Sequence, residues 1–306
     1  MLYVKPALAQ GGPTGGGTSG NSYPCLSNVT ITNGYRCAND QGVAYNYPQV
    51  YKTHLDESNN TVVDHQDPMA AKIGTTLNVT LNVTRSTLAQ NNYTGTLTIT
   101  AMYFTQGGIV FVPCDNVTPL SNLMPGFSAD VTFSLGALPN YVTKGDLVIF
   151  FNGDGYIDGM YEETLYLVYN QPAAPQAIPW IGVLEDACIF AHGQSSDMTV
   201  SKELTFGVFF GGNFGVQSKR YFKATGIPHH IDMGWGPVEG DHKFLLTEFL
   251  SIQGETLGNC VDVSTYLAIC ANALGLNFSL GNYKETNNAV FYTNNMNFIG
   301  MNGSVA

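Results

Sequence analysis

A period-two alternation of apolar and polar residues runs through the first half of this 306-residue chain. In residues 76–83, leucine and valine alternate with threonine and asparagine, and Thr96–Thr100 repeats the pattern. Successive side chains of a β-strand point to opposite faces, so this pattern predicts strands with one buried face. Four further segments are expected to be strands: Ile109–Val112, Ala129–Leu135, Leu147–Phe151 and Thr164–Tyr169.

Clusters of glycine, proline and asparagine separate these segments at intervals of about ten residues, a spacing typical of antiparallel sandwiches. We therefore predict an all-β antiparallel sandwich of the immunoglobulin-like type over residues 23–170. Residues 1–22 are expected to form a flexible Gly-rich leader, in which Ala7-Leu8-Ala9 resembles the cleavage end of a signal peptide. A stiff Pro/Ala linker at 171–177 then leads to a second domain at 178–306.

A different period, of three and four residues, begins at Cys260 in this second domain. Apolar residues recur after it on one helical face: Val263, Leu267, Cys270 and Leu274. Gly275 closes the pattern, as expected of an amphipathic helix with a glycine stop. A cysteine in the first turn lies beside unpaired N–H groups and the positive end of the helix dipole, and both favour the thiolate. The pattern therefore predicts a cysteine nucleophile at a helix start.

The string GNCVDVSTYLAICANALGL resembles the nucleophile helix of the transglutaminase-like superfamily, whose fold is papain-like. The match consists of Gly258 and Cys260 at the helix entry, Asp262, and the exit Ala273-Leu274-Gly275. The resemblance implies an α+β transglutaminase-like domain with Cys260 as its nucleophile and a histidine and an aspartate on later strands. No histidine follows His242. The domain is therefore expected to be incomplete at its C-terminus, in a segment of a longer reading frame.

Gln253 lies seven residues before Cys260, close to the place where papain-like enzymes carry an oxyanion-hole glutamine. The resemblance makes Gln253 an oxyanion candidate, and the backbone N–H of Cys260 is the other donor. Two alternatives remain for Cys260. It could be a small buried hydrophobic residue, or it could form a disulfide with Cys188 or Cys114.

The stretch from Asn152 to Asp158 resembles the middle of a calcium loop, with Asp154 and Asp158 as candidate ligands. Phe150 occupies the first ligand position and Tyr161 the bidentate one, so an Asp-Gly turn between two strands is the favoured alternative. Calcium is the one metal considered, and the predicted cysteine chemistry requires no cofactor.

Charge and cysteine content constrain the location and partners of the protein. The formal net charge of −11 argues against nucleic acids and anionic membrane surfaces. No apolar run approaches the roughly 18 residues of a membrane span. Six cysteines and eight Asn-x-Ser/Thr sequons favour an extracellular or cell-surface protein. Cys25 and Cys37 flank a short turn-rich stretch and are predicted to form a disulfide.

Two classes of function remain. The first is an exported transglutaminase-like acyl-transfer enzyme or protease-like hydrolase that acts on peptide or glutamine amides. Its partner would be a peptide or protein substrate. The second is a non-catalytic extracellular protein that uses the sandwich for adhesion or spacing, with an extracellular surface ligand as its partner.

Overall fold

The computed structural model describes residues 24–46, 49–55, 61–63, 67–85, 87, 90–114, 117–153, 159–210, 231–232, 243–244, 246–251 and 260–278. By their internal contacts, the residues of the chain fall into two units. The strand unit runs to Cys37 and continues from Ala44 to Val168, whereas the helical unit takes Ala38–Val43 and everything from Tyr169 on. The chain therefore enters the helical unit twice.

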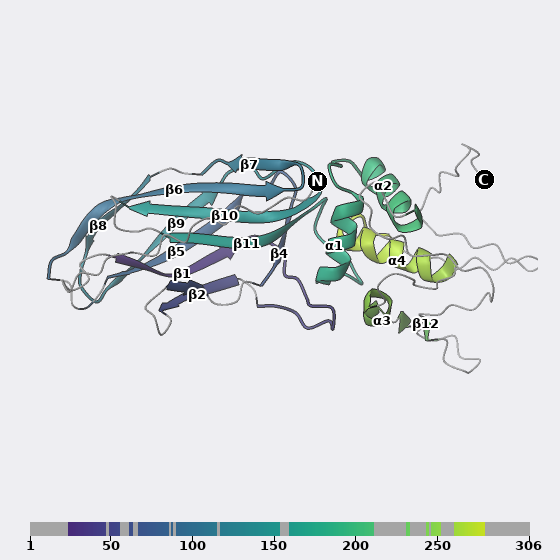
Figure 1. Ribbon diagram of the computed structural model, residues 1–306, viewed down its shortest axis with the longest axis horizontal. Coiled ribbons are helices and arrows are strands. Elements are labelled where there is room, and N and C mark those ends of the chain that lie inside the picture. Colours follow the sequence, from purple (N-terminus) through teal and green to yellow (C-terminus); the bar gives the residue numbers. More distant parts are fainter. Residues whose placement is uncertain are drawn as a thin grey trace, which may run out of the picture. The chain divides into compact units, whose positions relative to one another are not determined.

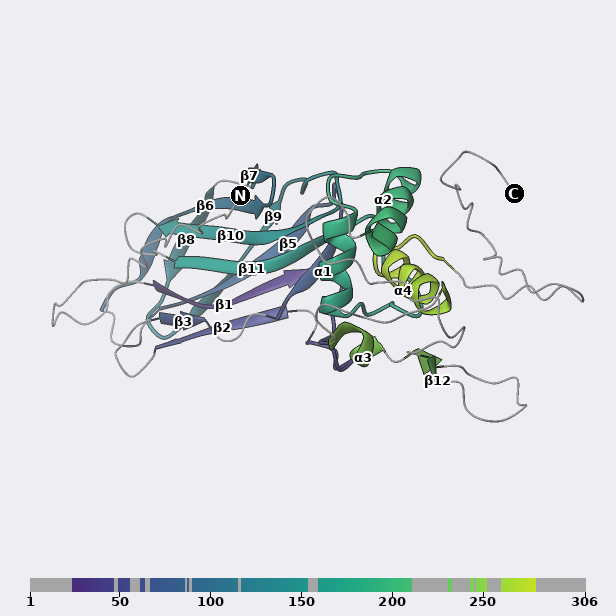
Figure 2. The ribbon, with the colours of Figure 1, turned by 45° about the vertical axis from the view of Figure 1, so that its right-hand side comes forward.

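The strand unit contains two sheets, which Figures 1 and 2 show as two layers. The first sheet has the order β3-β2-β1-β5-β9, with strands at Pro24–Thr32 (β1), Gln49–Leu55 (β2), Thr61–Val63 (β3), Leu77–Arg85 (β5) and Ser128–Leu135 (β9). The second has the order β4-β11-β10-β6-β7, with strands at Met69–Lys72 (β4), Tyr93–Thr105 (β6), Gly108–Val112 (β7), Thr143–Gly153 (β10) and Gly159–Val168 (β11). A further strand, β8 (Val117–Leu123), pairs with β6.

The six predicted segments are confirmed, since each coincides with part of a strand to within one residue. Burial alternates most clearly in β5, β6 and β9. In β5 the inward side chains are at most 1% exposed: Leu77, Val79, Leu81 and Val83. The threonines and asparagines between them point outward and bond across the sheet, as Thr80 does with Thr132 (Oγ1–Oγ1 3.1 Å). The burial of apolar inner faces from both layers forms the core of a β-rich, sandwich-like unit.

One pairing departs from the predicted all-antiparallel arrangement. β4 pairs with β11 in parallel, with Met69 opposite Leu165. β4 has only four residues, and Met69, Ala70 and Ala71 are all buried, so it shows no alternation from which its partner could be inferred. The relation of this unit to the immunoglobulin-like type stays a prediction.

The predicted Cys25–Cys37 disulfide is wrong, because Cys37 is a free thiol. Cys25 lies at the start of β1, opposite Thr84. From Cys25 to the end of β1 at Thr32 the extended chain covers about 23 Å, whereas a disulfide requires Cα atoms within about 7 Å. The stretch between the cysteines is therefore mainly strand. Cys37 is fully buried, and this burial, with the nearby charge of Glu163, raises the pKa of its thiol well above the ordinary value.

We expect the stability contributed by the buried Cys37 thiol to be lost at alkaline pH. The pKa of Cys37 is raised in the folded state, so its contribution is complete below the unfolded pKa of about 8.5 and falls as pH rises further. Urea denaturation between about pH 7 and pH 10 gives the free energy of unfolding of the wild type and of Cys37→Ala. The difference between the two proteins should shrink as pH rises. A difference that stays constant would contradict the prediction.

The helical unit contains α1 (Ile181–Phe190), α2 (Asp197–Phe210), α3 (Leu246–Ser251) and α4 (Cys260–Ala273), with the short antiparallel pair β12 (Ile231–Asp232) and β13 (Lys243–Phe244). Helices α1, α2 and α4 pack on one another. Gly207 of α2 allows this approach, because a Cβ atom there would lie 2.3 Å from the Phe190 ring of α1. No helix in the described part of the chain is long and apolar enough to cross a membrane.

The end of α4 confirms the predicted glycine stop. Gly275 has φ +79°, the N–H of Leu276 donates to Ala271 O (2.9 Å), and the N–H of Gly275 donates to Asn272 O (3.0 Å). This double closure is a Schellman motif. The stretch that enters the unit is bonded to the same helix end. Asn170 N–H donates to Leu274 O (2.9 Å), and Ala173 N–H donates to Asn272 O (2.9 Å). The first residues of the predicted 171–177 linker are therefore packed on α4.

Gly275→Ala should destabilise the protein by about 3 kcal/mol, from the left-handed backbone conformation and from overpacking. A Cβ atom at this position would lie 2.5 Å from the backbone of Asn170 and Gln171. Gly193→Ala is the matched control, because Gly193 has a similar φ of +81° but no atom within 4 Å of the point that a Cβ would occupy. It should cost only about 1 kcal/mol. Urea denaturation compares the two variants, and equal losses would refute the role of the Asn170 contact.

Candidate functional site

Cys260 is the first residue of the 14-residue helix α4, at the position the sequence predicted. The N–H groups of a first helical turn have no partner within the helix, and the positive end of the helix dipole lies there. The backbone arrangement that the nucleophile hypothesis requires is therefore present. The side chain of Cys260 lies outside the described part of the structure.

A buried stripe holds α4 in place. The predicted apolar face is at most 1% exposed throughout: Val263, Leu267, Cys270 and Leu274. Because α1 and α2 pack against α4, this face is covered from two sides. Burial of four such side chains favours one fixed position of the helix by several kcal/mol, on the order of 1.5–3 kcal/mol for each large side chain.

Tyr266 ties α4 to both α1 and α3. Its hydroxyl donates to Asp186 Oδ2 of α1 at 2.6 Å, and its ring lies 4.5 Å from that of Phe249 of α3, centroid to centroid. Burial raises the pKa of Tyr266 well above its ordinary value, and the neighbouring Cys270 and Asp186 raise it further. Tyr266 therefore remains a neutral donor at physiological pH. Tyr266 and Asp186 are 80 positions apart in the chain, and no local pattern in the sequence predicted their hydrogen bond.

The disulfide alternatives for Cys260 are not realised. Cys188 lies buried on α1 and Cys114 is half-buried after β7, and both are thiols in the structure. Cys270 shares α4 with Cys260, ten residues further on, which places them about 15 Å apart along the helix axis. Cys188 and Cys270 therefore belong to the apolar packing of the helical unit.

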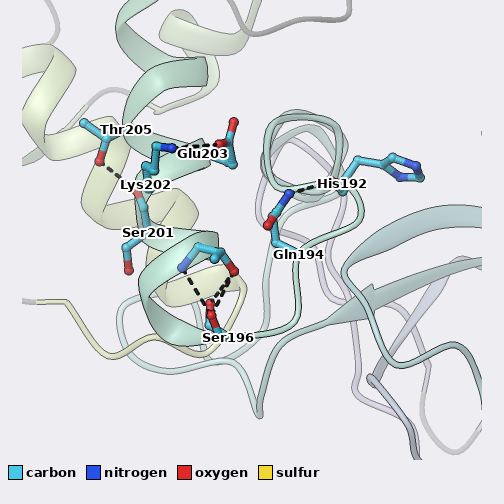
Figure 3. A network of polar contacts seen from close by, with 8 residues as sticks. His192, Gln194, Ser196, Ser201, Lys202, Glu203 and Thr205 are labelled. Atoms are coloured by element: carbon cyan, nitrogen blue, oxygen red, sulfur yellow. Dashed lines mark hydrogen bonds and ion pairs between the residues drawn. The ribbon is translucent and has the colours of Figure 1, made fainter.

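Polar contacts at the start of α2 form a helix cap (Figure 3). The Ser196 hydroxyl accepts from the Thr199 N–H (3.4 Å) and bonds to the Thr199 hydroxyl (2.9 Å). Figure 3 also shows the His192 ring pointing away from α2, while the Gln194 side chain donates to the His192 carbonyl oxygen (3.5 Å). Partial burial lowers the pKa of His192, so this imidazole is neutral near neutral pH. The Ser196–Thr199 contacts therefore stabilise the start of α2.

The other sequence-predicted site residues are Gln253, Asp154 and Asp158, and all three lie outside the described residues. The calcium candidates fall between β10, which ends at Gly153, and β11, which begins at Gly159, two strands that pair antiparallel. The alternative to a calcium loop, an Asp-Gly turn between two strands, requires two strands paired in this way. Across the described ranges, no three His, Cys, Asp or Glu side chains gather as a metal-ion site.

Comparisons with known proteins show no family for this chain. No protein-family model matches, and no curated protein matches. Among solved structures, similarity extends to the DNA glycosylase AlkC of Pseudomonas fluorescens (12% identity, TM-score 0.23), over 31% of this chain and 27% of the glycosylase. A superoxide reductase (neelaredoxin) of Ignicoccus hospitalis has 18% identity and a TM-score of 0.21, over 33% of this chain and 76% of the reductase. Neither similarity is strong enough to inform the fold or function, and neither shows a transglutaminase-like fold.

Tyr266→Phe should lower the free energy of unfolding by about 1.5 kcal/mol, because the hydrogen bond from a buried hydroxyl to a carboxylate is lost. Urea denaturation near neutral pH measures the loss. Asp186→Asn keeps an acceptor for the tyrosine and should cost less. A Tyr266→Phe protein as stable as the wild type would show that the hydroxyl does not anchor α4.

Proposed function

We propose that this chain carries a cysteine acyl-transfer site of the transglutaminase-like type, with Cys260 as its nucleophile. The observation that carries the proposal is the start of α4 at Cys260, on a helix held by buried contacts with α1 and α2. The resemblance of residues 258–276 to a transglutaminase-like nucleophile helix is the reason for proposing acyl transfer. The position at a helix start supports it, because it favours the thiolate form.

The reaction would use a peptide or glutamine amide as the acyl donor. The Cys260 thiolate attacks the amide carbonyl carbon and forms a C–S bond, while the carbonyl oxygen becomes an oxyanion that the Cys260 backbone N–H can receive. Collapse of this intermediate breaks the C–N bond, and the amine or ammonia leaves with a proton. Water or a second amine then attacks the thioester and breaks the C–S bond, which restores the thiol. We assign the proton donor to none of the described residues.

The proposal includes a β-sandwich accessory domain and export to the cell exterior. The exposure of three sequon asparagines supports export, because a glycan needs an exposed acceptor. Asn78 on β5, Asn92 just before β6 and Asn277 after α4 are all exposed. The formal net charge of −11 also agrees with a protein that binds neither nucleic acids nor anionic membrane surfaces.

A second candidate function is non-catalytic binding or spacing by the strand unit. The observation that favours it is the apolar exposure of β7, where Ile109 is 52% and Phe111 72% exposed. β7 ends the sheet order and carries no charged residue to block strand addition. An exposed apolar strand of this kind is typical of sheets that pair with an extended segment of another molecule.

Alkylation of the native protein with iodoacetamide tests the enzyme proposal, with labelled sites mapped by mass spectrometry. Cys260 should label about tenfold or more faster than an ordinary exposed thiol near neutral pH, because a lowered pKa increases the thiolate fraction. Cys37 is the internal control and should label only after unfolding, because it is fully buried. An inert Cys260 would leave the binding or spacing function as the better account.

A further inference from the structure

Residues 38–43, here called the strap, have a defined shape of their own although they form neither helix nor strand. The Asn39 side-chain oxygen accepts the N–H groups of Gln41 (3.0 Å) and Val43 (2.9 Å). The backbone of Asn39 exchanges two further bonds, accepting from Gly42 N–H (2.9 Å) and donating to Val43 O (2.9 Å). At the base, Tyr45 N–H donates to Cys37 O (2.9 Å). The strap is therefore a closed loop whose geometry is set by Asn39.

The strap supplies the N-terminal cap of α1. The N-cap residue Trp180 makes no side-chain cap bond, and the first turn of α1 contains no acidic residue. Instead, Asp40 Oδ1 accepts the N–H of Gly182 at 2.8 Å, from 142 positions away in the chain. Backbone bonds reinforce this contact, since Ala38 N–H donates to Pro179 O (2.9 Å) and Ile181 N–H donates to Ala38 O (2.9 Å). A carboxylate at the start of a helix accepts a hydrogen bond from an N–H group that has no partner within the helix. Its negative charge also interacts favourably with the positive end of the helix dipole.

Glycines allow this close approach. A Cβ atom on Gly182 would lie 2.8 Å from the Asp40 carboxylate, and one on Gly42 would lie 3.0 Å from the Trp180 ring. Gly42 also has φ +77°, which an ordinary side chain rarely adopts. Where the strap contacts the start of α1, each of the two segments therefore has a glycine.

The same residue of the strap also binds α3. The Thr247 hydroxyl of α3 donates to the backbone carbonyl oxygen of Asp40 at 3.0 Å. Asp40 therefore holds α1 through its side chain and α3 through its main chain. Movement of this residue changes both contacts at once.

We propose that the strap is a conformational clamp that couples the start of α1 to α3 through Asp40. The chain on both sides of the strap belongs to the strand unit. Displacement of Asp40 therefore loosens α1 and α3 together, because both helices bond to this residue. This inference does not depend on Cys260 or on the proposed reaction.

Hydrogen exchange of the full chain, read by mass spectrometry, tests the coupling through two variants that each remove one contact. Asp40→Ala removes the bond to α1 and should also accelerate exchange in α3. Thr247→Val removes the bond to α3 and should also accelerate exchange in the first turn of α1, because coupling between two sites is reciprocal. The directly affected turn of α1 should exchange about tenfold faster in Asp40→Ala, as expected for a lost cap.

Matched variants and an internal reference decide the outcome. Asp40→Asn keeps an oxygen acceptor and Thr247→Ser keeps the hydroxyl, so both should exchange like the wild type in α1 and α3. The amides of β5 are the reference and should not change. The clamp is refuted if each variant affects only the helix it touches, if the conservative variants behave like the disruptive ones, or if β5 accelerates equally, which would indicate general unfolding.

Discussion

Hydrogen bonding of helix ends is the constraint on which the helical unit depends. An α-helix leaves N–H groups at its start and carbonyl groups at its end without partners, and burying them unpaired is costly. Here both needs are met by segments remote in the chain. Asp40 receives an N–H at the start of α1, while Asn170 and Ala173 donate to the end of α4. These contacts position both helices and determine where the chain enters the unit.

The candidate nucleophile lies at the opposite end of α4 from this closure. Its helix is held along its length by the buried stripe and by Tyr266, which bonds to Asp186 and packs on Phe249. Acyl transfer needs a thiolate in a fixed place, since misplacement by about 1 Å can cost about a hundredfold in rate. A rigid helix whose first residue is cysteine meets the backbone part of that requirement. The same scaffold would also suit a protein that uses α4 only for packing, and the reactivity of Cys260 separates the two.

Burial of the inner faces of two sheets accounts for the strand unit without any cross-link from Cys37. Cys37 contributes as a small buried residue beside Glu163, which is also fully buried and accepts a hydrogen bond from the Tyr161 hydroxyl. The outward side chains of β5 and β7 differ. β5 presents bonded threonine and asparagine side chains, whereas β7 presents Ile109 and Phe111 to solvent. Exposed apolar side chains of this kind are the basis of the proposed binding function of β7.

Local patterns in the sequence predicted six strand segments and α4, and the tertiary structure decided the partners of these elements. Alternation in residues 76–83 predicted β5, and the three- and four-residue steps after Cys260 predicted α4 with its glycine stop, because both periods follow from backbone geometry over neighbouring residues. The parallel β4–β11 pair, the Asp40 cap and the Tyr266–Asp186 bond had no local signal. The Asp40 cap and the Tyr266–Asp186 bond join residues 142 and 80 positions apart, and β4 is too short to show an alternation. The Cys25–Cys37 prediction failed for the same reason, since nearness in sequence does not bring two residues together when an extended strand separates them.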